Sequence, residues 1–142
     1  MRNGVPPAYA EIAAATVRGL GDDLELAVTV DGELPMRMPD EDTNTIIAVK
    51  MRTTDDSEFV LGAHASEQGW KPFAKWYGHK RPFPGRFEIR GGTLTMTIPW
   101  SFLDGPRRFR WFANASWIQS AGVIPTYSID LAPSAEGHPF PG

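Results

Sequence analysis

Apolar and polar residues alternate with a period of two along most of this chain. In the segment 23–31, Leu24, Leu26, Val28 and Val30 recur at every second position, and polar residues occupy most positions between them. Successive side chains of a β-strand point to opposite faces, so this pattern predicts a strand with one face in a hydrophobic core and the other toward solvent.

The same period predicts further strands at 12–17, 47–51, 57–61, 86–90, 93–98, 109–117 and 127–131. Gly91 and Gly92 separate two of these segments, which is typical of a tight hairpin. The alanines at 13–15 would suit a helix, but the run is too short for a helix to propagate. We expect only a short helical turn, at residues 99–103.

About eight or nine short strands, with no helical segment long enough to connect parallel strands, predict an all-β antiparallel fold. Fourteen glycines and thirteen prolines are scattered between the strands, as expected for tight connections. We therefore predict a two-sheet β-sandwich of the jelly-roll type. A small antiparallel β-barrel is the alternative.

The length of 142 residues suits a single domain over residues 1–142, with flexible ends at about 1–8 and 134–142. Cysteine is absent, which excludes disulfides and thiolate metal sites. No run approaches the ~20 apolar residues of a membrane span, so we expect a soluble chain. The proline-bearing ends resemble linker edges. If the chain is one domain of a longer protein, that protein could be secreted or otherwise extracytoplasmic.

The net charge of −3 hides an uneven distribution along the chain. Residues 1–70 carry five basic and thirteen acidic side chains, whereas residues 71–110 carry nine basic side chains against only Glu88 and Asp104. These charges could pair across strands or simply be solvated. They could also form a positive surface for an anionic or polar ligand. The acidic balance of the whole chain argues against nucleic acid as that ligand.

The order of these landmarks resembles a known group of sandwiches. The strands at 12–17 and 24–30, the hairpin ending at 92–99, the strand at 111–116 and the closing Asp-Leu-Ala-Pro at 130–133 are similar to the DOMON-like or family 9 carbohydrate-binding-module-like domains. The resemblance implies ligand binding by an appended domain of a bacterial secreted protein, to sugars or haem, often with structural calcium. The methionine and histidine ligands of the haem-binding members have no evident counterpart here.

The segment 68–83 combines five aromatic residues with four basic ones. Sugars stack their C–H faces on aromatic rings and need hydrogen-bond donors for their hydroxyls. We therefore predict ligand-binding roles within this segment for Trp70, Lys75, Trp76, Tyr77 and Arg81. The alternative is that Trp70 and Trp76 belong to the core.

The strand at 109–117 supplies a second candidate group. Trp117 stands at the end of this strand and could line a cleft together with Asn114. Phe109 and Trp111 are expected to lie in the core.

Acidic turns offer the only metal candidates. Asp40, Asp42, Asp55 and Asp56 have the oxygen ligands that calcium prefers, but their spacing matches no calcium loop, and solvated turns are the alternative. The three histidines lie far apart, and no serine lies in a nucleophile-elbow context. We therefore predict no cofactor and no catalytic residue.

These observations favour a non-catalytic accessory module that binds carbohydrate or another polar ligand through an aromatic and basic surface. Two alternatives remain: a small enzyme that acts by shaping a pocket around its substrate, and a structural or protein-interaction domain. An open aromatic cleft would favour the module, an enclosed apolar cavity the enzyme, and a filled interior without a cleft the structural domain.

Overall fold

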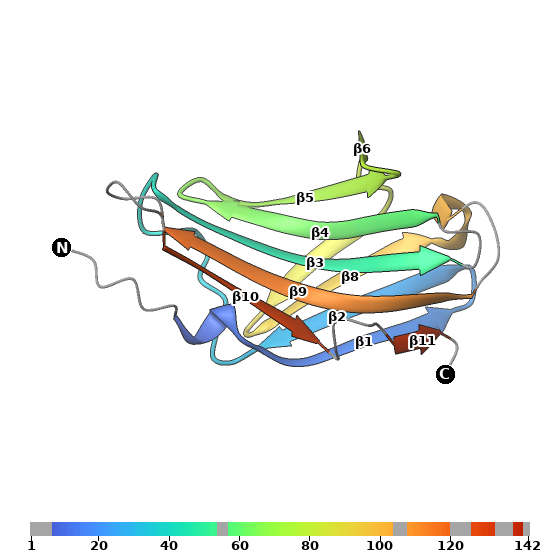
Figure 1. Cartoon of the computed structure of the whole chain (residues 1–142), viewed down its shortest axis with the longest axis horizontal. Helices are drawn as coiled ribbons and strands as arrows, with labels where there is room; N and C mark the ends of the chain where they lie inside the picture. The colour runs from blue at the N-terminus through green and yellow to red at the C-terminus, as the bar shows by residue number, and fades with distance from the viewer. Residues whose placement is uncertain (1–6, 54–56, 104–107, 120–125, 133–137, 141–142) are drawn as a thin grey trace.

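Two antiparallel sheets form the protein. The computed structural model describes residues 7–53, 57–103, 108–119, 126–132 and 138–140. One sheet has four strands and the other has seven. Figure 1 shows the two sheets as separate layers with long, gently curved strands.

The smaller sheet has the strand order β1-β2-β8-β7. Its strands are β1 (Ile12–Leu20), β2 (Asp23–Val30), β7 (Arg86–Arg90) and β8 (Thr93–Pro99). Both of its hairpins turn at glycines with positive φ, 63° at Gly21 and 59° at Gly91. Glycine takes this conformation at little cost because it lacks a β-carbon.

The larger sheet has the order β10-β9-β3-β4-β5-β6, and β11 also pairs with β9. Its strands are β3 (Thr43–Thr53), β4 (Glu58–Ser66), β5 (Gly69–Trp76), β6 (His79–Arg81), β9 (Phe109–Gln119), β10 (Thr126–Ala132) and β11 (His138–Phe140). Two short 3-10 helices complete the described elements, η1 (Ala8–Ala10) and η2 (Trp100–Leu103). No helix among the described residues is long and apolar enough to cross a membrane.

The core lies between the two sheets. Leu26 of β2 pairs with Met96 of β8, and both side chains are fully buried. From the larger sheet, Ile47, Val49 and Leu61 face them and are also fully buried. Hydrophobic burial of this kind is the dominant favourable contribution to folding.

The predicted sandwich is confirmed, and the alternative barrel is wrong because the two sheets do not close on each other. The alternation at 23–31 becomes β2, and the hairpin predicted around Gly91 and Gly92 joins β7 to β8. The alanine run at 13–15 lies in β1, as expected. The predicted helical turn is η2.

Segment 68–83, for which we predicted no strand bounds, contains two strands, β5 and β6. In β5, Phe73 and Lys75 occupy outward positions although one is apolar, so polarity does not alternate. Pro72 also lies within β5 and has no N–H to donate. It is tolerated because β6 pairs only with residues 74–76, which leaves the other side of β5 unpaired at Pro72.

Residues 138–140 near the chain end form a strand that we did not predict. β11 lies within the range 134–142 that we expected to be flexible, and it pairs with β9. The ring of Phe140 stacks on Phe109 with centroids 4.9 Å apart, and it also contacts Trp100 at 5.7 Å. A three-residue strand with a proline at its centre is too short to show a period of two, so the alternation of polar and apolar residues could not predict β11.

The two long sides of the sandwich differ. At one side, β1 runs beside β10, which links the two sheets. At the other side, β7 is the last strand of the smaller sheet, and β5 with β6 ends the larger sheet. Outward along β7 stand Arg86, Glu88 and Arg90, all exposed, with an ion pair of 2.7 Å between Arg90 and Glu88. This second side is where a cleft lies.

Candidate functional site

The loop 31–42 crosses from the smaller sheet to the larger one and forms the base of the cleft. The backbone N–H of Leu34 donates to the carbonyl oxygen of Gly91 in the β7–β8 turn at 2.9 Å. The N–H of Met38 donates to the carbonyl oxygen of Ser66 at the end of β4 at 2.8 Å. The loop is therefore fixed to both sheets, so a ligand would not have to order it on binding.

Buried side chains anchor the same loop. Leu34 and Met38 are 8% and 1% exposed, and the sulfur of Met38 accepts a hydrogen bond from the Thr45 hydroxyl at 3.2 Å. Met36 lies between these two anchors and is 90% exposed. The loop thus holds one large apolar side chain in solvent at the mouth of the cleft.

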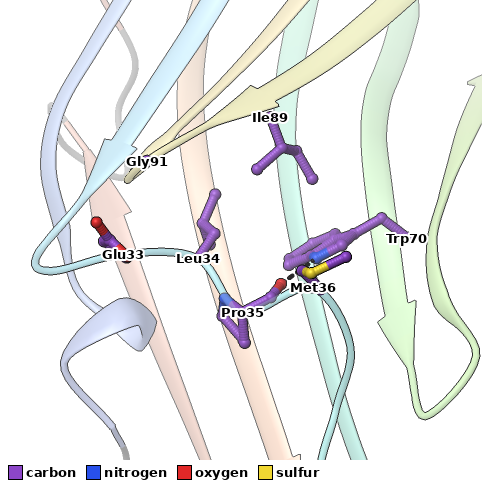
Figure 2. Close-up of a pocket in the computed structure, with 7 residues that line it drawn as sticks. All are labelled: Glu33, Leu34, Pro35, Met36, Trp70, Ile89 and Gly91. Atoms are coloured by element: carbon purple, nitrogen blue, oxygen red, sulfur yellow. Dashed lines mark hydrogen bonds between the residues drawn. The ribbon is translucent and has the colours of Figure 1, made fainter.

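Trp70 forms the wall of the cleft on the side of the larger sheet. It lies at the start of β5, is half-buried, and packs against the core. Its indole N–H donates to the carbonyl oxygen of Pro35 at 2.7 Å, which fixes the orientation of the ring (Figure 2). A ring held in this way can be contacted without further loss of side-chain freedom.

The cleft is open to solvent and has a volume of about 400 Å³. It is lined by Glu33, Leu34, Pro35, Met36, Trp70, Ile89 and Gly91 (Figure 2). The lining is mostly apolar, and Glu33 supplies the one charged side chain, a hydrogen-bond acceptor. An apolar wall with a single polar group suits a ligand that combines a C–H face with hydroxyl groups.

Trp76 lies at the opposite end of β5 from Trp70 and belongs to the edge of the core. Its ring stacks on the buried Phe59 with centroids 5.8 Å apart and an interplanar angle of 16°. The guanidinium of Arg81 lies over the same ring, 4.8 Å from its centroid, which is a cation–π contact. Trp76 and Arg81 are therefore engaged with each other and with the core.

Tyr77 follows Trp76 in the β5–β6 turn and is the exposed ring of this end, with 56% of its surface accessible. Its φ is 53°, a left-handed conformation that non-glycine residues adopt at a cost. The Tyr77 hydroxyl forms a hydrogen bond with the Ser57 hydroxyl, and its N–H donates to the carbonyl oxygen of Glu58 at 3.0 Å. These contacts hold the turn in place.

The remaining ligand-binding candidates lie outside the cleft. Lys75 and Asn114 occupy outward positions of the larger sheet, on β5 and β9, and both are half-buried. Trp117 is 4% exposed and lies in the interior. The structure therefore does not bring Trp117 and Asn114 together in one cleft, because residues three apart on a strand face opposite sides.

The acidic turn at Asp40 bonds to its own backbone. One carboxylate oxygen of Asp40 accepts hydrogen bonds from the Asp42 N–H and the Thr43 hydroxyl, each at 2.9 Å. Asp55 and Asp56, the other calcium candidates, lie outside the described residues. Among the residues that are described, no three His, Asp or Glu side chains gather closely enough to hold a metal.

We therefore predict that a millimolar chelator leaves the thermal midpoint of the protein unchanged. A metal that binds only the folded state raises stability by mass action, and its removal would lower the midpoint. Differential scanning calorimetry with and without chelator, followed by added calcium, measures this. A fall that calcium restores would contradict the prediction.

Sequence reasoning singled out Trp70 but missed its companions in the cleft. The loop was expected only as an acidic connection, and Ile89 was expected only as part of a strand. Residues 33–36, 70 and 89–91 are far apart along the chain, so no local pattern joins them. The one signal is the presence of Leu34, Met36 and Met38 in an acidic loop, because no alternating strand accounts for these apolar residues.

Comparisons with protein-family models, curated proteins and solved structures found no match. The resemblance to the DOMON-like and family 9 carbohydrate-binding-module-like domains therefore stays a prediction.

Proposed function

We propose that this domain is a non-catalytic binding module, and that a carbohydrate or another polar molecule with an apolar face is its ligand. The observation that carries the proposal is Trp70, whose half-buried ring is held against an open cleft by the hydrogen bond to Pro35. Sugar-binding modules need this combination of a fixed aromatic surface and access from solvent.

The shape of the cleft supports a module over the two alternatives. An enzyme of the pocket type needs an enclosed cavity with several convergent polar groups, whereas this cleft is open and carries one carboxylate, from Glu33. A purely structural domain has no need for an exposed Met36 beside a fixed indole. In the proposed complex, the ligand's C–H face contacts Trp70, Met36 and Ile89, and its hydroxyls donate to Glu33.

Replacement of Trp70 tests the proposal. We expect Trp70→Ala to weaken ligand retention by about tenfold or more, because truncation of a central aromatic contact typically costs over 1 kcal/mol of binding. Trp70→Phe keeps a flat ring but loses the hydrogen bond to Pro35. Its affinity should therefore fall between those of the wild type and of Trp70→Ala. A glycan array and pull-down on insoluble polysaccharides identify the ligand, and titration then compares the variants.

Tyr77→Ala is the matched control, since it removes an exposed ring at the other end of β5. Melting curves of each variant show whether the fold is intact at the assay temperature. If Tyr77→Ala lost binding while folded Trp70→Ala kept it, the ligand would lie elsewhere and the proposed cleft would be wrong. No retention of the wild-type domain on any carbohydrate would overturn the carbohydrate assignment.

A further inference from the structure

The outward side of the β5–β6 hairpin carries three lysines. Lys71, Phe73 and Lys75 alternate with the inward-facing residues of β5, so they share the outer face of the larger sheet. Lys80 of β6 pairs directly with Lys75 in the register of the two strands. This face lies on the opposite side of β5 from Trp70 and the cleft.

Like charges directly opposite each other on neighbouring strands destabilise a sheet. Lys75 and Lys80 form such a pair, and within the described parts of the chain no acidic side chain forms an ion pair with Lys71, Lys75 or Lys80. Glu58 is the one acid on the outward positions of β4, and it is engaged by other bases. Its carboxylate lies 3.3 Å from the ammonium of Lys50 and 3.2 Å from the guanidinium of Arg52. Among the described residues, the Lys75–Lys80 pair therefore has no acidic side chain that offsets its repulsion.

Phe73 lies between the two lysines of β5 and is half-buried. Its neighbour across the sheet is Gly62 of β4, which has no side chain. A β-carbon at Gly62 would lie 2.7 Å from the β-carbon of Ala48 and 2.4 Å from the carbonyl oxygen of Ile47, so the position cannot take a side chain without a shift of its neighbours. Gly62 and Ala48 are themselves buried, so this point of the outer face is covered and Phe73 is the apolar side chain that reaches solvent there.

We propose that this face binds an acidic polysaccharide, a polymer of uronic acid residues. Successive outward residues of a strand stand roughly 7 Å apart, and Lys75 and Lys80 are about 5 Å apart across the hairpin. One pyranose ring on Phe73 therefore has an ammonium group on either side, at Lys71 and Lys75. Carboxylates of the polymer pair with these lysines and with Lys80, and so remove the repulsion between Lys75 and Lys80.

The charge of the rest of the molecule favours an acidic glycan over nucleic acid. The net charge is −3, and thirteen of the seventeen acidic residues lie at positions 1–70. A nucleic-acid duplex would contact acidic residues of the protein as well as the lysines, and its phosphates would be repelled by them. Binding of a duplex depends on a dominating positive field, which this protein lacks. A single-stranded polyuronate is thinner than a duplex and can lie on the hairpin alone.

Lys80→Glu separates a binding role from a structural one. The change places an opposite charge across from Lys75, so the thermal midpoint should rise or stay the same, whereas retention on immobilised polygalacturonate should fall by about tenfold or more through the loss of a charge-assisted contact. Affinity electrophoresis at fixed salt, with calorimetry on the same samples, measures both. An unchanged retention, or one that falls only as the domain unfolds, would overturn the proposal.

Arg86→Glu is the matched control. Arg86 is an exposed base on β7 of the other sheet, and its replacement changes the net charge by the same amount. Retention on polygalacturonate should stay at the wild-type level in Arg86→Glu. Equal losses in Arg86→Glu and Lys80→Glu would mean a general charge effect and would overturn the proposal.

Two further probes define the ligand. Fully methyl-esterified polygalacturonate keeps the sugar backbone but loses the carboxylate charge, so we expect at least a tenfold weaker retention. Double-stranded DNA at the same salt concentration should not be retained. Equal binding of the esterified polymer would exclude a role for the carboxylates, and tight binding of DNA would replace the acidic glycan by a non-specific polyanion.

Discussion

Leu26→Ala is expected to lower the free energy of unfolding by about 2–5 kcal/mol, the range for truncation of a buried leucine. Leu26 is fully buried at the centre of β2, and it pairs with the fully buried Met96. Truncation of Leu26 removes buried apolar surface and leaves a cavity. The two sheets can close this cavity only partly, because each is held in place by its own backbone hydrogen bonds. Urea denaturation followed by tryptophan fluorescence measures the loss.

Thr95→Ala serves as the control for this prediction. Thr95 is on β8 next to Met96 in the chain, but it points to the half-exposed outer face. We expect a loss below about 1 kcal/mol, since surface substitutions away from special features have small effects. Equal losses in Leu26→Ala and Thr95→Ala would contradict the assignment of the inner and outer faces.

The second large effect is expected at Trp76. Trp76→Ala should cost about 3 kcal/mol of stability, near the lower end for loss of a large aromatic, because the ring is half-buried and stacked on Phe59. Trp76→Phe should cost less than about 1 kcal/mol. It keeps a ring on Phe59 and removes the indole N–H, which is buried without an acceptor among the described residues and is thus costly to keep.

Thermal and urea unfolding of the two Trp76 variants measure how much the ring of Trp76 stabilises the core. If Trp76→Ala melted like the wild type, the ring would contribute little to the core and would be free to contact a ligand. If Trp76→Phe were as destabilised as Trp76→Ala, the indole N–H would have an acceptor, and the stacking on Phe59 would not carry the stability.

A strand could be predicted from the sequence where its two faces differ fully in polarity. In β2 and β8, every inward residue is apolar and most outward ones are polar, because one face meets the core and the other meets water. In β5 the division fails. Phe73 faces outward, and the inward Trp70 and Trp76 lie near an open side of the sandwich, so neither face is uniform.

The tryptophans show a second limit of prediction from the strand pattern. Alternation places Trp111 and Trp117 on one face of β9, and the structure buries both. It also places Trp70 and Trp76 on one face of β5, yet the first lines a cleft and the second packs on Phe59. Which of the two rings meets a cleft is decided by the path of loop 31–42, and a strand pattern contains no information about that path.

The exposed edge of β7 has a consequence for how copies of the domain meet in concentrated solution. An edge strand presents unpaired backbone groups and can recruit the same strand of another molecule, which is a route to aggregation. If two copies paired in antiparallel fashion about Glu88, the two Glu88 carboxylates would face each other, and Arg86 of each copy would face Arg90 of the other. The charges along β7 thus oppose edge-to-edge polymerisation, although its backbone edge remains open.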